Sequence, residues 1–296
     1  MANIYYSDNL AAERLKRCYD IAPPRVRQYL QAEVNFVLDR VRPGDVVLDL
    51  GCGYGRAIPQ LAQKAAFVVG IDTSLSSLGF GLSFLHGVRN CLLLKMDAGG
   101  MSFFDGSFDA VVCIQNGISA FQVDPFHLVS ESIRVARENG IVFFSTYSGK
   151  FWRYRLEWFR LQAAEGLLGE IDEEKTGDGI IVCKDGFRAT TFSPEQFLAL
   201  TSKFSVDVNI VEVDESSIFC LIRKKRTRLD IPAGHDQKIP GSTIDNFVAQ
   251  ARSSKIPTEY IELADAPHGF DILQNTQASK DTVQQALEFL KGRLLP

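Results

Sequence analysis

The sequence predicts an α/β protein in which a mostly parallel sheet is covered by helices on both faces. Short apolar runs alternate with helix-forming segments from residue 46 to residue 168, which is the order of elements found around parallel sheets. A turn with three glycines follows the first run. Two further runs, VDVNIVEV and SIFCLIRKK, are joined by a connection so short that it favours antiparallel pairing. A parallel sheet with an antiparallel final strand is therefore expected.

Two helices are expected before the first strand. Ala22-Pro23-Pro24 separates them, and an apolar stripe at helical spacing runs from Val26 to Val41. The remaining strands and helices of this part follow from apolar runs and from the segments between them. Strands are expected in VVLDL, FVVGID, CLLLKMDA, FDAVVCIQ and GIVFFSTYS, and helices at 56–64, 74–86, 125–137 and 151–168.

Residues 180–225 have a different pattern. Lys184-Asp185-Gly186 lies between two β-rich runs and predicts a hairpin. Ser193 and Gln196 have the spacing of a capping box, with Pro194 at the first helical position. The first domain is therefore expected to cover 1–225, and a second segment 226–296.

Composition and charge narrow the classes of partner. The 296 residues carry a formal net charge of -4 at pH 7, which gives no general attraction to nucleic acid or to anionic lipid. The six cysteines are scattered without metal-ligand spacing, so no metal site is expected. Their thiols are expected to be reduced. The first residues lack an apolar signal core, and no window is long and apolar enough to span a bilayer. A cytoplasmic protein without nucleic-acid or membrane partners is expected.

The glycine turn, Asp49-x-Gly51-x-Gly53-x-Gly55, indicates a ligand that approaches the backbone closely. Dinucleotide-binding loops instead have the spacing G-x-G-x-x-G and place a pyrophosphate on a helix N-terminus. A carboxylate two residues before the first glycine would repel a pyrophosphate and would attract a cationic group. The loop therefore favours a ligand with a positive charge.

Two more acids end the next two strands. Asp72 closes FVVGID at a position where a carboxylate accepts from ribose hydroxyls, and Asp97 follows the third strand, where it could accept from an adenine amine. The carboxyl ends of parallel strands meet at one edge of a sheet. Together with Asp49, these residues describe a site for a nucleoside that carries a positive charge.

VLDLGCGYGR, VVGIDTS, LLKMDA and SFDAVVCIQNGISAF together resemble the four successive motifs of class I S-adenosylmethionine-dependent methyltransferases, over about residues 25–225. The resemblance implies a Rossmann-like sheet of seven strands with S-adenosylmethionine at its carboxyl ends. It implies Asp49 near the methionine amino group, Asp72 on the ribose and Asp97 near the adenine. Alternatively, Asp97 caps a loop and Arg56 forms a surface salt bridge. The full set of expected cofactor contacts is Asp49, Gly51, Cys52, Gly53, Gly55, Arg56, Asp72, Thr73, Asp97, Ala98, Gln115 and Asn116.

Methyl transfer from a sulfonium is an in-line displacement that needs alignment and exclusion of water more than it needs reactive side chains. The catalytic residues are therefore not fixed by the sequence, with Asn116 and Tyr147 as candidates. The motifs of enzymes that methylate bases are absent, so a small-molecule acceptor is expected. Phe151, Tyr154, Trp158 and Leu161 share a helix face, which either packs in the core or forms a substrate wall with Trp152. The alternative function is a catalytically silent cofactor-binding scaffold.

Residues 226–296 have a βαβα pattern and resemble the C-terminal part of a dienelactone hydrolase-like α/β-hydrolase. By position, Asp236 matches the acid and His268 the base of that family. No G-x-S-x-G or G-x-C-x-G elbow occurs in the chain, and without a nucleophile acyl transfer is not expected. The segment is therefore either a relic or an interaction surface, with a homodimer or a protein partner as the expected contact.

Overall fold

The computed structural model describes residues 10–121 and 123–225. Contacts between Cα atoms divide the chain into two units, Met1–Lys225 and Arg226–Pro296. The predictions for the hydrolase-like segment, Asp236 and His268 among them, lie outside the described residues. Within the described ranges, no helix is long and apolar enough to cross a bilayer.

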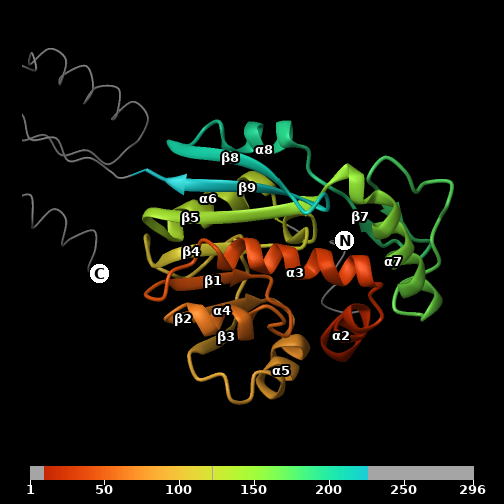
Figure 1. The fold of residues 1–296 in the computed structure, drawn as a ribbon, viewed down its shortest axis with the longest axis horizontal. Coiled ribbons are helices and arrows are strands. Elements are labelled where there is room, and N and C mark those ends of the chain that lie inside the picture. Colours follow the sequence, from red (N-terminus) through yellow and green to blue (C-terminus); the bar gives the residue numbers. More distant parts are fainter. Residues whose placement is uncertain (1–9, 122, 226–296) are drawn as a thin grey trace, which may run out of the picture. The chain divides into compact units, whose positions relative to one another are not determined.

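A seven-stranded sheet forms the centre of the described unit, in the order β3-β2-β1-β4-β5-β9-β8 (Figure 1). Strand β9 runs antiparallel to both of its neighbours, and the other neighbouring pairs are parallel. The predicted α/β fold class with an antiparallel strand is confirmed. The strands are β1 (Val46–Leu50), β2 (Phe67–Asp72), β3 (Cys91–Lys95), β4 (Phe108–Cys113), β5 (Ala136–Tyr147), β8 (Val206–Val213) and β9 (Ser217–Lys224).

Helices cover both faces of this sheet. Helices α3 (Pro24–Leu38) and α4 (Ile58–Lys64) share one apolar core with the strands, and α6 (Pro125–Val135) and α8 (Pro194–Thr201) share the core on the other face (Figure 1). Because both faces are covered, β4 is buried along its whole length and consists of an apolar run with a single acid. Helix α8 begins with the predicted capping box between Ser193 and Gln196.

A third apolar cluster lies beyond the carboxyl ends of the strands. It joins α2 (Ala12–Asp20), the start of α3, α7 (Trp152–Ala164) and a separate hairpin of β6 (Ile181–Val182) and β7 (Arg188–Ala189). Helix α5 (Leu75–Phe84) follows β2 and contacts α2. These elements surround the strand ends, where the sequence places the candidate site.

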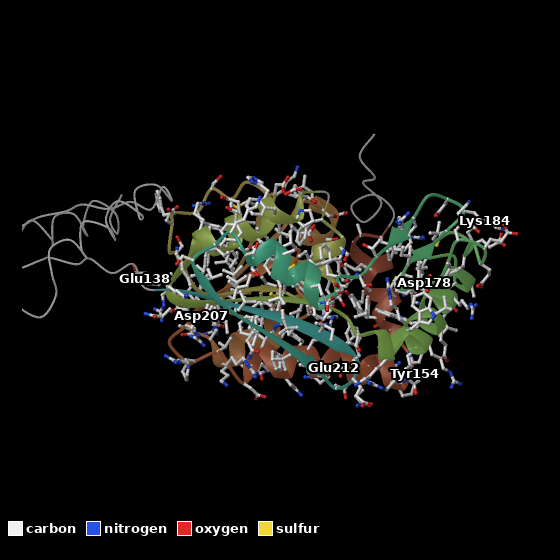
Figure 2. The ribbon with its side chains drawn as sticks, turned by 90° about the horizontal axis from the view of Figure 1, so that it is seen from above. Glu138, Tyr154, Asp178, Lys184, Asp207 and Glu212 are labelled. Carbon is white, nitrogen blue, oxygen red and sulfur yellow. The ribbon has the colours of Figure 1, made fainter. Side chains whose placement is uncertain are left out.

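The structure corrects two details of the sequence analysis. Strand β5 begins at Ala136, directly after α6, so residues expected in a helix and a turn extend the strand. The apolar face predicted for α7 is only partly buried, because Tyr154 and Leu161 are 37% and 40% exposed. Figure 2 shows Tyr154 on α7 at the margin of the molecule. The buried residues of α7 are Arg155, Trp158, Phe159 and Gln162.

Candidate active site

The glycine turn between β1 and α4 has the backbone conformation that its sequence requires. Gly51, Gly53 and Gly55 have φ of 66, 57 and 82°, in the left-handed region where a side chain is strained. A Cβ at Gly51 would lie 2.8 Å from Cζ of Phe121, and one at Gly53 would lie 2.9 Å from Cδ2 of Leu15. The left-handed conformation therefore favours glycine in this turn, and a Cβ would also require the Phe121 or Leu15 side chain to shift.

A small cavity of about 50 Å³ lies against the turn. Ligand pockets usually hold about 300 Å³ or more, and here Leu15 and Tyr19 of α2 line the cavity. A nucleoside therefore requires these side chains to move outward. The predicted contact residues that the structure brings together in the lining are Asp49, Gly51, Cys52, Gly53, Arg56 and Gln115.

Asp49 is a buried acid at the end of β1. It is 5% exposed and pairs in register with Gly70 of β2 and Val112 of β4. Burial raises the pKa of its carboxyl to about 7, and the Asp72 carboxylate also raises it, while the Arg56 guanidinium lowers it. An ionised carboxylate in this position is costly unless a cation approaches it.

Arg56 supplies the opposite charge in the same cavity. Its Nε and Nη2 atoms are buried and have no hydrogen-bond partner among the described residues. The guanidinium lies 4.8 Å from the ring centre of Tyr19. Unpaired guanidinium donors form a fork that fits a carboxylate. The cavity therefore presents one anionic and one cationic group, which matches the ammonium and carboxylate of an amino acid. The described part of the chain shows no salt bridge for Arg56, which was the alternative interpretation.

Asp72, the last residue of β2, accepts a hydrogen bond from the glycine turn that follows the neighbouring strand β1. Its Oδ2 accepts from the Gly53 amide at 2.9 Å, and its Oδ1 accepts from the Ser74 amide at 2.8 Å. Burial raises the pKa of this carboxyl. Each carboxylate oxygen has a second lone pair, so Asp72 can still accept from hydroxyls of a ligand. The next residue, Thr73, is exposed beside it.

Asp97 caps a turn, which was the alternative to a contact with adenine. Its side chain is exposed, and its Oδ1 accepts from the Gly99 amide at 2.8 Å, which caps the turn after β3. Ala98 is buried in the core on the α6 side of the sheet. The contact of these two residues with an adenine stays a prediction.

The end of β4 is strained. Gln115 and Asn116 have φ of 59 and 60°, which is unusual for two consecutive residues other than glycine. Gln115 lines the cavity, and its Oε1 accepts from the Tyr19 hydroxyl at 3.1 Å. The Asn116 amide instead donates to the Thr190 carbonyl at 2.9 Å and accepts from the Thr146 hydroxyl at 2.7 Å. Asn116 thus joins the segment after β4 to a neighbouring loop.

Tyr147 lies at the end of β5 and lines a second hollow of about 660 Å³ with Asp178 and Thr190. Figure 2 labels Asp178 near the β6–β7 hairpin. Burial raises the pKa of the Tyr147 hydroxyl to about 12, so this group is protonated at neutral pH and acts as a donor, not as a base. Trp158 packs in the core, where its indole N–H donates to the Cys18 carbonyl at 2.9 Å.

Tyr19 and Glu33 also belong to this region, and Glu33 was not identified from the sequence. Tyr19 covers the cavity and contacts both Gln115 and Arg56. Glu33 is a fully buried acid of α3 that accepts from the Gln115 amide. A signal for Glu33 was present, because an acid between Leu30 and Val34 interrupts the apolar stripe of this helix.

Residues 47–140 match a family described as a methyltransferase domain. A 2-methyl-6-phytyl-1,4-hydroquinone methyltransferase of Synechocystis is 31% identical over 129 residues, which are 40% of this chain and 40% of the relative. A ubiquinone biosynthesis O-methyltransferase of Azoarcus is 32% identical over 127 residues, 42% of this chain and 52% of the relative. The chain therefore spans about two fifths to one half of the length of these relatives.

Solved structures have the same fold. The PH0226 protein of Pyrococcus horikoshii has a TM-score of 0.52 at 21% identity, covering 70% of this chain and 94% of its own. The N-methyltransferase NodS of Bradyrhizobium japonicum, solved with S-adenosyl-L-homocysteine, has a TM-score of 0.50 at 13% identity, covering 74% and 100%. Residues 47–140 are thus similar to a methyltransferase domain, and the described unit has the fold of these solved structures. The cofactor that this similarity indicates is S-adenosylmethionine, as the sequence motifs predicted.

Proposed function

We propose that the protein transfers a methyl group from S-adenosylmethionine to a small-molecule acceptor. One observation carries the proposal: the buried Asp49 carboxylate and the Arg56 guanidinium line the same cavity beside the glycine turn. Asp49 is 5% exposed, and two nitrogens of Arg56 are buried without partners among the described residues. The methionine end of the cofactor carries an ammonium and a carboxylate, which satisfy both groups.

The same arrangement supports a role for each remaining contact residue. Asp49 would bind the ammonium, Arg56 the carboxylate and Asp72 the ribose hydroxyls. Asp97 and Ala98 follow β3 and would lie near the adenine. The turn residues, with Thr73 beside the ribose, would line the rest of the site, and their backbone allows close approach. The full list of proposed contacts is Asp49, Gly51, Cys52, Gly53, Gly55, Arg56, Asp72, Thr73, Asp97, Ala98, Gln115 and Asn116.

The cofactor, when bound, supplies an electrophilic methyl group on a sulfonium. The protein then has to align the acceptor and exclude water. Tyr19 and Leu15 lie over the turn and would close around the methionine end. Tyr147 and Asn116 would orient an acceptor as hydrogen-bond donors, because the pKa of Tyr147 is raised to about 12 and it is no base at neutral pH.

The acceptor is a small molecule in this proposal. The relatives named above carry the names of enzymes that methylate a hydroquinone and that act in ubiquinone biosynthesis, which supports a ring-bearing acceptor over a macromolecule. We place the protein in the cytoplasm, without nucleic-acid or membrane partners. Residues 226–296 would contact a second copy or a protein partner, and hydrolase activity is not part of the proposal.

Incubation with radiolabelled S-adenosylmethionine and panels of phenols, hydroquinones, amines and carboxylic acids tests the proposed function. We expect transfer of label to at least one of these small molecules, and loss of transfer in Asp49→Ala. Cofactor binding without transfer to any panel member would contradict the proposed activity and favour the silent scaffold.

A further inference from the structure

Glu33 is a buried carboxylate that the methyl-transfer chemistry does not use. It belongs to α3, is fully buried, and bonds to a residue that follows β4 and to the first residue of β9. Its Oε1 accepts from the Ser217 hydroxyl at 2.6 Å, and its Oε2 accepts from the Gln115 amide at 2.6 Å. Burial of an ionisable group is unfavourable unless its hydrogen bonds are satisfied, so the bonds of Glu33 need an explanation.

Glu33 accepts a hydrogen bond from the strained segment that follows β4. The Gln115 amide donates both to Glu33 and to the Ser145 hydroxyl, the latter at 2.8 Å. Gln115 and Asn116 both lie in the left-handed region, at φ of 59 and 60°. Such a conformation is unfavourable for residues other than glycine and persists only where the surroundings hold it. The two acceptors on the Gln115 amide are in the right place to do so.

This strained segment forms a wall of the candidate site. Gln115 lines the same cavity as Asp49 and Arg56, and its side chain accepts from Tyr19 of the covering helix. Glu33 itself does not line the cavity. A movement of the Gln115 backbone would therefore displace both the wall and the contact with Tyr19.

We propose that Glu33, together with Ser145, is a positioning residue that holds the Gln115 backbone in its left-handed conformation and thereby shapes the cofactor cavity. The proposal rests on the proposed function. A purely structural role would instead be to tie α3 to β9 through Ser217. These roles separate because the bond to Ser217 does not involve Gln115.

Two serine variants form a matched pair that tests the proposal. Ser145 and Ser217 are both fully buried, and each hydroxyl is bonded in the cluster around Glu33. Only Ser145→Ala removes an acceptor from the Gln115 amide. The binding of S-adenosylhomocysteine is measured by calorimetry, and the exchange of the Gln115 amide hydrogen is measured by NMR on the full chain.

We expect Ser145→Ala to weaken binding by about five- to tenfold and to speed Gln115 exchange by a similar factor, as the loss of one hydrogen bond implies. Ser217→Ala should change either quantity by less than about twofold, even if both variants lower the melting temperature equally. Glu33→Gln should stay near the wild type, because its amide oxygen can accept from Gln115 while its NH₂ donates to Ser217.

Equal effects of the two serine variants on binding and exchange would overturn the proposal, as would unchanged values in Ser145→Ala. Glu33→Ala extends the test if it folds, with an expected loss of binding greater than that of Ser145→Ala. Amide exchange reports on Gln115 without any ligand. Absence of binding by the wild-type protein would therefore count against the proposed function, and unchanged exchange in Ser145→Ala would count against the joint role of Glu33 and Ser145.

Discussion

Replacing Asp49 by Asn is expected to stabilise the ligand-free protein while weakening its binding of the cofactor. Asp49 is 5% exposed, and burial raises the pKa of its carboxyl from 3.8 to about 7. A carboxyl whose pKa is raised in the folded state binds protons more tightly there than in the unfolded state. The free energy of unfolding therefore falls as the pH rises through this interval, and the penalty is fully present above it. Asn has the same shape and carries no charge.

The size of the effect follows from the shift. A rise in pKa from 3.8 to about 7 corresponds to roughly 4 kcal/mol, at about 1.4 kcal/mol per unit. At about pH 5 the folded carboxyl is mostly protonated, so less than half of this penalty applies. The stabilisation by Asp49→Asn should therefore grow by about 2 to 3 kcal/mol between about pH 5 and about pH 8.

Urea unfolding at both pH values measures this change, with Asp39→Asn as the control because Asp39 is exposed. Calorimetry with S-adenosylhomocysteine measures the second effect, an expected loss of affinity of about tenfold or more because the ammonium loses its carboxylate. An Asp49→Asn protein that is no more stable than the wild type at the higher pH, or whose advantage does not depend on pH, would refute the reasoning.

Two further substitutions test the packing of the site. Gly53→Ala should cost about 1 to 2 kcal/mol in urea unfolding, because Gly53 has φ of 57° and a Cβ there would lie 2.9 Å from Leu15; Gly149→Ala is the control, since its Cβ would meet nothing within 4 Å. Trp158→Phe should cost about 1 kcal/mol or more and speed proteolysis within α2, because it removes the bond to the Cys18 carbonyl. Unchanged stability in either variant would contradict the packing described.

The sequence predicted the strand ends and the glycine turn well because their signals are local. Apolar runs buried on both faces and left-handed glycines are visible without knowledge of distant partners. The buried face of α7 was mispredicted because Arg155 is buried through contacts outside its helix, with the Tyr147 ring at 4.4 Å and the Gly179 carbonyl at 2.8 Å. Apolar periodicity does not report such burial of a charged side chain.

The same reason explains why Glu33 was not identified. Its hydroxyl partner, Ser217, lies 184 positions along the chain, and its amide partner, Gln115, lies 82 positions away. The sequence shows an acid on an apolar stripe but not what satisfies it. The three acids after the strands were recognisable by spacing, yet spacing alone does not reveal that Asp97 caps its own turn at Gly99.

The central claim is that Asp49 and Arg56 hold the methionine end of the cofactor beside the glycine turn. The most direct test titrates wild-type protein and Arg56→Met with S-adenosylhomocysteine and with 5′-methylthioadenosine, which lacks the amino-acid end. We predict that Arg56→Met weakens S-adenosylhomocysteine binding by about tenfold or more and leaves methylthioadenosine binding within about twofold. Equal losses for both ligands, or no loss for either, would contradict the claim.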